Sequence, residues 1–241
     1  MCNWREEEDY EFCRDLTPQL WAWQFLRRHP EYHKDYEWFI TLWRALEADY
    51  GKPPDRDFTR WKNDPRAWAP EHMTADLCEE DKHCASPDGD RVLIECAMGA
   101  KWGFYKFPVA PDVALAKVPD QLLWREIDVK PLLVENPEDI QQDESIVTLS
   151  FNLAWPLKPQ LESGQRQLRG MKAKFQRTAQ SYTPENLKRF IRLLDAKKEN
   201  ADIEEIITEL YGGDDEMYHD DIVLVTALLS GDYRYLAFTG N

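Results

Sequence analysis

The chain has 241 residues and a formal net charge of −15 at pH 7. This acidic balance argues against general coating of nucleic acid, while an apolar content of 43% is enough to bury a core. No apolar run approaches the roughly 18 residues that a membrane helix needs, and the N-terminal residues lack the basic and apolar regions of a secretory signal. The sequence therefore predicts a cytoplasmic protein of one large or two small domains.

Helix signals occur at both ends of the chain. Thr17-Pro18 and Thr183-Pro184 each place a capping hydroxyl before a proline that can occupy the first helical position. Gly212-Gly213 follows an apolar run and predicts the end of a helix. Apolar side chains at helical spacing extend these signals into whole elements. The predicted helices cover residues 19–28, 31–50, 159–176, 184–198, 202–211 and 221–229.

Between these helices the pattern favours strands. Residues 91–98, RVLIECAM, read as a strand, and residues 146–153 alternate between apolar and polar side chains, as half-buried strands do. Residues 101–107 are a further candidate strand, residues 111–137 read as a meander of short extended pieces, and residues 52–90 as an irregular connection. We therefore predict an α+β fold with a helical N-terminal hairpin, a mixed β-containing middle and a C-terminal helix-turn-helix-like bundle. The predicted domains are 1–155, aromatic-rich, and 156–241, helical.

Charge is segregated along the sequence. Residues 156–198 hold eleven Lys and Arg against three acids, whereas the residues after Lys198 hold eleven acids and one basic residue, Arg234. In the helix predicted at 159–176 we expect Leu161, Leu168, Met171 and Phe175 to be buried, with cations spaced by three beside them. We expect the cations of the next helix to point outward. The candidate phosphate-contacting residues are Arg166, Arg169, Lys172, Lys188, Arg189 and Arg192. Pairing of these cations with the chain's own acidic parts is the alternative.

The last predicted helix has the wrong charge for reading DNA. Three short helices in succession are compatible with a helix-turn-helix, but the third begins His219-Asp220-Asp221, and carboxylates repel phosphates. The acidic residues around it are instead candidates for binding a basic partner. They are Asp214, Asp215, Glu216, Asp220 and Asp221. The same loop lacks the alternating ligand order of a calcium site, so we predict no metal there.

Nothing in the sequence argues positively for an enzyme. There is no phosphate loop, dinucleotide fingerprint, HExxH or GxSxG, and we assign no catalytic residue and no cofactor. Cys78, His83, Cys84 and Cys96 could be grouped as a zinc set, but their spacing lacks the short pairs of such sites. With five cysteines and no signal peptide, we expect reduced thiols. An enzyme hidden in the middle of the chain stays a weaker alternative.

Several segments carry a resemblance to a known family. The segment at 21–39, WAWQFLRRHPEYHKDYEWF, is the most specific, and four further stretches follow in the same order, at 101–112, 122–128, 149–168 and 187–212, with SGDYRYLAF at the end. Together they resemble a bacterial transcriptional-regulator-like family carried on integrative and conjugative elements. The resemblance implies a C-terminal module that binds DNA or another regulator. This chain departs from the family in having only Arg234 near its GYR-like ending, where several arginines are usual.

Two functions therefore stand side by side. The first is a non-enzymatic regulator of a bacterial mobile element that binds double-stranded DNA through its C-terminal helices. The second is an acidic inhibitor that binds a basic nucleic-acid-binding protein, such as an activator or a defence complex of the CRISPR type, by imitating a phosphate backbone. The sequence predicts neither the oligomeric state nor the role of the N-terminal half.

Overall fold

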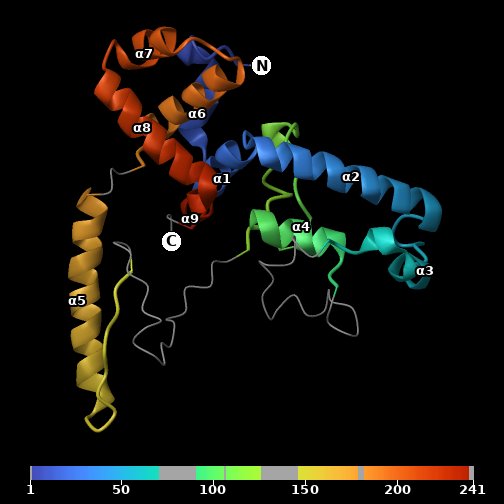
Figure 1. The fold of residues 1–241 in the computed structure, drawn as a ribbon, viewed down its shortest axis with the longest axis horizontal. Helices are drawn as coiled ribbons and strands as arrows, with labels where there is room; N and C mark the ends of the chain where they lie inside the picture. The colour runs from blue at the N-terminus through green and yellow to red at the C-terminus, as the bar shows by residue number, and fades with distance from the viewer. Residues whose placement is uncertain (1, 71–90, 106, 126–145, 179–181, 239–241) are drawn as a thin grey trace. The chain divides into compact units, whose positions relative to one another are not determined.

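The computed structural model describes residues 2–70, 91–105, 107–125, 146–178 and 182–238 (Figure 1). Its contacts divide the chain into two compact units, one of residues 1–127 with 187–241 and one of residues 128–186. The units do not follow the division that we predicted after residue 155, because the C-terminal helices share a unit with the N-terminal residues. In chain order the elements are η1 (Glu7–Asp15), α1 (Pro18–Leu26), α2 (Pro30–Tyr50), α3 (Phe58–Asn63), η2 (Pro65–Ala67), α4 (Ile94–Trp102), η5 (Leu115–Lys117), α5 (Leu157–Thr178), α6 (Pro184–Lys198), α7 (Ile203–Tyr211), α8 (Asp215–Ala227), η7 (Leu228–Asp232) and α9 (Tyr233–Leu236).

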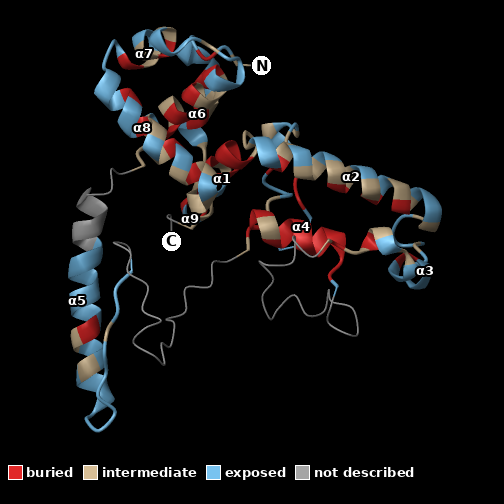
Figure 2. Ribbon diagram, viewed as in Figure 1, coloured by how far each residue is buried: buried red, intermediate tan, exposed pale blue. Residues whose placement is uncertain are grey.

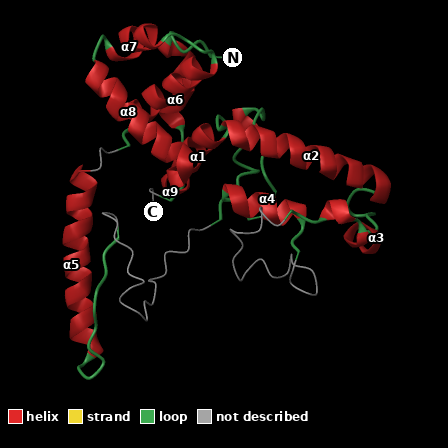
Figure 3. Cartoon of the chain, in the orientation of Figure 1, coloured by secondary structure: helices red, strands yellow, loops and turns green. Residues whose placement is uncertain are grey.

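The described residues contain no strand, so the predicted α+β fold with a β-containing middle is wrong (Figure 3). The apolar run predicted as a strand at 91–98 leads into α4, in which every residue except Lys101 is buried. A helix buried on nearly all sides shows apolar side chains without a helical period, even where a charged residue such as Glu95 is buried among them, and such a pattern does not distinguish it from a strand. Residues 146–153 are extended but join no sheet within the described part. Among the described residues, isolated bridges join Trp68 with Leu93 and Phe104 with Trp124.

The six predicted helices are confirmed, with one large shift of a boundary. The Thr183 hydroxyl accepts a hydrogen bond from the Asn186 amide at 3.2 Å and so caps α6, as predicted. The Asp214 carboxylate accepts from the Met217 amide at 3.0 Å and caps α8. This cap starts α8 six residues before Asp221, where we predicted its beginning. Within the described residues, no helix is both long and apolar enough to span a membrane.

Aromatic side chains build the core of the first unit, in which α1 packs against α9, α2 against α3 and α4, and α7 against α8. The ring centroids of Trp43 and Trp61 lie 4.8 Å apart. The Arg56 guanidinium lies 4.6 Å from the Trp43 ring and 3.9 Å from the Trp61 ring, and it pairs with Glu47 at 3.3 Å. Ring faces and a carboxylate thus compensate the charge of a side chain that is only 4% exposed. The largest fully buried side chains include Trp4, Tyr10, Trp23, Phe25, Tyr32, Phe39, Trp61, Phe104, Phe190 and Tyr233.

The second unit contains α5 and, before it, residues 146–155, here called the extended segment, which lack regular secondary structure up to residue 152 and turn at 153–155 (Figure 2). Gln160 on α5 fastens this segment: its amide oxygen accepts from the Asn152 amide at 2.9 Å, and its NH₂ donates to the Asn152 carbonyl at 3.0 Å. A Cβ atom at Gly164 would lie 3.2 Å from Leu149 and 3.6 Å from Phe151, so this glycine makes room for both side chains against the helix.

The apolar side of α5 is not a core. Leu161, Leu168 and Met171 are 56%, 40% and 52% exposed, so the predicted burial of this stripe is wrong. The side chain of Phe175 lies outside the described residues. Gly164 is the only α5 residue in the buried class among those whose side chains are described. The spacing of apolar residues therefore predicts the helix correctly, but it does not predict whether the apolar side of the helix is buried.

Candidate nucleic-acid and partner surfaces

Two of the candidate cations on α6 contact the N-terminal residues of the same unit. Lys188 donates a hydrogen bond to Glu7, and that bond together with the ammonium charge holds the pKa of the Glu7 carboxyl below its usual range. Arg192 donates to the backbone carbonyls of Trp4 at 2.9 Å and Arg5 at 3.1 Å, and it lies 4.0 Å from Glu7. The Arg192 side chain is 12% exposed. These interactions fasten the start of the chain to α6.

The third candidate cation on α6 forms a buried ion pair with α8. The Arg189 guanidinium donates to the Asp221 carboxylate at 2.6 Å, and the Asp221 side chain is 2% exposed. Burial alone lowers the pKa of Arg189, but the hydrogen bond to Asp221 and its charge outweigh burial and raise it. The prediction that the α6 cations point outward is therefore wrong. Asp221, a candidate for binding a basic partner, already binds Arg189.

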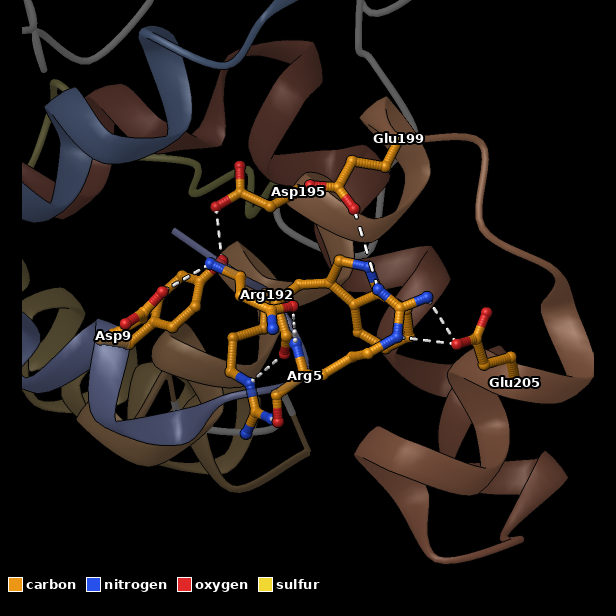
Figure 4. A network of polar contacts seen from close by, with 9 residues as sticks. Arg5, Asp9, Arg192, Asp195, Glu199 and Glu205 are labelled. Atoms are coloured by element: carbon orange, nitrogen blue, oxygen red, sulfur yellow. Dashed lines mark hydrogen bonds and ion pairs between the residues drawn. The ribbon is translucent and has the colours of Figure 1, made fainter. Parts of the chain in front are cut away.

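Sequence reasoning missed two further ion pairs that hold α6 and α7 to the N-terminal residues. Arg28 donates to Asp195 at 2.7 Å, and the Tyr10 hydroxyl donates to the same carboxylate at 2.7 Å. Burial and then the Asp195 charge raise the pKa of Tyr10. Arg5 donates through Nε to Glu205 at 2.7 Å, and Figure 4 shows this contact in the same network as Asp195. The partners lie 167 and 200 positions apart in sequence, so no local pattern indicates them.

The candidate cations on α5 have the opposite surroundings. Arg166, Arg169 and Lys172 are exposed and follow one another at intervals of three along the helix. Within the described part of the chain, no ion pair neutralises any of them. Of the six predicted phosphate-contacting residues, these three alone are in the exposed class. They belong to the second unit, and the α6 cations belong to the first.

The acidic candidates around α8 also divide into two groups. Asp214 is exposed, but its carboxylate caps the helix. Asp215 lies 3.4 Å from the exposed His219, while Glu216 and Asp220 are exposed on the same helix. With Asp221 engaged inside the unit, the remaining four carboxylates are open to solvent. Exposed carboxylates of this kind can attract a cationic surface.

The structure gives no metal centre within the described ranges, where no group of three or more His, Cys, Asp or Glu side chains gathers. Cys78, His83 and Cys84 of the proposed zinc set lie outside the described residues. Cys96 forms a disulfide bond, so the prediction of reduced thiols is wrong for this residue. Cys2 and Cys13 are free, and burial raises the pKa of the Cys13 thiol to about 12.

A stretch near the start of the sequence matches a known family model. Residues 3–62 match the family model of a proteobacterial transcriptional regulator-like domain, which covers about a quarter of the chain. This segment holds η1, α1 and α2, and with them the residues Glu7, Tyr10 and Arg28 that contact α6. No curated protein matches, and no solved structure does. The N-terminal quarter of this chain is thus similar to a transcriptional regulator-like domain, which supports a regulatory role for the protein.

Proposed function

We propose that the protein is a non-enzymatic transcriptional regulator that contacts double-stranded DNA through α5. The regulator-like match at residues 3–62 supports the regulatory part of this proposal. The exposed cations Arg166, Arg169 and Lys172 support the DNA contact, since phosphate binding needs positive groups that are not already neutralised. The resemblance to regulators of integrative and conjugative elements suggests transfer or maintenance genes as its targets.

In this proposal α6 is a structural helix rather than a DNA-contacting one. Its cations at 188, 189 and 192 are bound to Glu7, Asp221 and backbone carbonyls. Contact with phosphates would first require these interactions to break, and the Arg189–Asp221 pair is the most buried of them. Helices α6 and α7 therefore hold the N-terminal segment, while α5 supplies the positive face.

Fluorescence anisotropy with labelled DNA from upstream of the protein's own gene tests this proposal. We expect the triple variant Arg166→Gln, Arg169→Gln, Lys172→Gln to bind about tenfold more weakly at low salt. The slope of log affinity against log salt should fall by about 3, since each phosphate contact contributes about 0.9. The matched control removes three exposed cations elsewhere, at Lys52, Lys117 and Lys198. No binding at low salt, or an equal loss in the control, would contradict DNA contact by α5.

A second candidate function rests on the exposed carboxylates of α8. Asp215, Glu216 and Asp220 lie on the helix whose position in a helix-turn-helix would face DNA, and their charge suits a basic protein instead. In this alternative the protein is an acidic inhibitor of a nucleic-acid-binding partner. Recovery of such a partner from host lysate, lost when these three residues become Asn or Gln, supports it. An affinity that does not change with salt excludes charge mimicry.

A further inference from the structure

The apolar side of α5 has the register of a helix-pairing seam. From Leu157 to Met171 its apolar residues are spaced by 4, 7 and 3 positions. Gly164 lies within the interval of 7 and divides it into steps of 3 and 4. This alternation of 3 and 4 places all of them at the a and d positions of a heptad repeat. The seam residues are Leu157, Leu161, Gly164, Leu168 and Met171. They span about 21 Å along the helix axis, which is the length of four turns of a partner helix.

Most of this seam is open within the described part of the chain. Leu149 and Phe151 from the extended segment fill the position left by Gly164. On either side of that contact, Leu161 remains 56% exposed and Met171 remains 52% exposed. The extended segment adds exposed apolar side chains of its own, of which Trp155 is 68% exposed. Apolar side chains that share one face in this way mark an interaction surface rather than scattered surface residues.

The charge of α5 restricts what can cover the seam. The helix carries six basic residues and a single acid, Glu162. Lys158 and Lys172 occupy positions directly beside the seam, where charges on paired helices meet. A second copy of α5 would bring like charge against like charge, and DNA offers phosphates to the cations but nothing comparable to the leucines. Apolar residues flanked by carboxylates fit both features of the surface.

We propose that the α5 seam docks an amphipathic helix of a partner protein, one with apolar residues at a and d and acidic residues beside them. This docking uses the leucines, so it does not depend on the proposed DNA contact. The cations beside the seam include Lys172, which that contact also uses. An acidic helix on the seam therefore competes with DNA for α5, and its binding would regulate the proposed function.

A designed peptide tests the docking surface directly. The probe is a labelled 21-residue peptide, about three heptads long, with Leu at a and d and Glu at e and g, and its binding to the full chain is measured by anisotropy without DNA. We expect micromolar binding that weakens with salt and falls at least tenfold in Leu161→Ser, Leu168→Ser. The matched control is Leu123→Ser, a 65% exposed leucine of the first unit, which should bind like the parent chain.

Two comparison probes separate this occupant from others. A peptide with Lys in place of Glu should not bind. Light scattering should give the same molar mass for the parent chain and for the seam variant Leu161→Ser, Leu168→Ser. Equal binding of the Lys peptide, no binding of the Glu peptide, or a seam-dependent dimer would overturn the proposal. Seam-dependent binding to vesicles of anionic phospholipid would overturn it in favour of a lipid surface. If the parent chain binds the Glu peptide but does not bind DNA at low salt, the proposed DNA contact is rejected and the docking surface is retained.

Discussion

α5 and α6 are basic helices that follow one another in the sequence, but their side chains have opposite surroundings. On α6, Phe190 is fully buried, and the three candidate cations bind carboxylates or carbonyls of the same unit. On α5, Leu168 is 40% exposed, and the candidate cations face solvent. Positive charge in a sequence can thus serve two purposes. It can stabilise a fold by pairing inside it, or it can remain available for a partner, and the tertiary contacts decide which.

The largest expected difference is in the stability lost when an apolar side chain is truncated on α6 rather than on α5. Phe190→Ala on α6 should destabilise the protein by about 4 kcal/mol, because it leaves a cavity in a packed core. Leu168→Ala on α5 should cost only about 0.5 kcal/mol, because the leucine is already partly in water. Urea unfolding followed by tryptophan fluorescence measures both. Similar losses in the two variants would contradict this difference between the helices and show that α5 also belongs to a core.

A smaller difference in stability is expected between variants of a buried and of an exposed carboxylate on α8. Asp221→Asn should cost about 3 kcal/mol, because it leaves the Arg189 guanidinium without its charged partner inside the protein. Its neighbour Asp220 is exposed, and Asp220→Asn should change stability by less than about 0.5 kcal/mol. Thermal or urea unfolding of the two variants checks the difference. If they are equally stable, the cations of α6 are not held by the fold as we describe.

The smallest effect should appear at Glu7 and should depend on pH. Because Lys188 lowers the pKa of Glu7 in the fold, this pair stabilises the protein above the unfolded pKa of Glu, about 4.3. The contribution is lost as the pH falls through the lower folded pKa. Glu7→Gln should therefore cost less than about 1 kcal/mol near pH 7, since the pair is partly exposed, and should flatten the acid side of the stability profile.

The control for this prediction is Glu8→Gln, a change of charge at an exposed neighbour in η1. It should leave the acid side of the profile as it is in the parent chain. If Glu8→Gln and Glu7→Gln give the same profile, the effect comes from net charge rather than from the contact with Lys188.

The sequence predicts the helices well because their ends depend on local chemistry. Thr183 caps α6, and Gly212 ends α7 with a φ of +60°, a conformation that glycine adopts without strain. The middle of the chain fails for a different reason. The run at 91–98 is rich in apolar side chains because α4 is buried on nearly all sides, and the alternation at 146–153 describes a segment without a neighbouring strand in the described residues. Local pattern does not reveal what an element packs against.

The candidate surfaces were predictable only in part for the same reason. Sequence reasoning identifies the cations of both helices and names internal pairing as an alternative. It cannot assign Lys188 to Glu7, which lies 181 positions earlier, or Arg28 to Asp195. Nor does the period of α5 show that Leu161 is open to solvent. These facts depend on contacts between segments far apart in the chain.

The attachment of the N-terminal residues to α6 has a practical consequence. The match at residues 3–62 marks a recognisable stretch of sequence, yet Arg28 and Tyr10 within it find their carboxylate on Asp195. A fragment cut after residue 62 would lose that carboxylate and the helix against which the first residues lie. The segment that matches the family model is therefore not the segment that folds independently. A fragment that keeps these contacts must include both the N-terminal residues and α6.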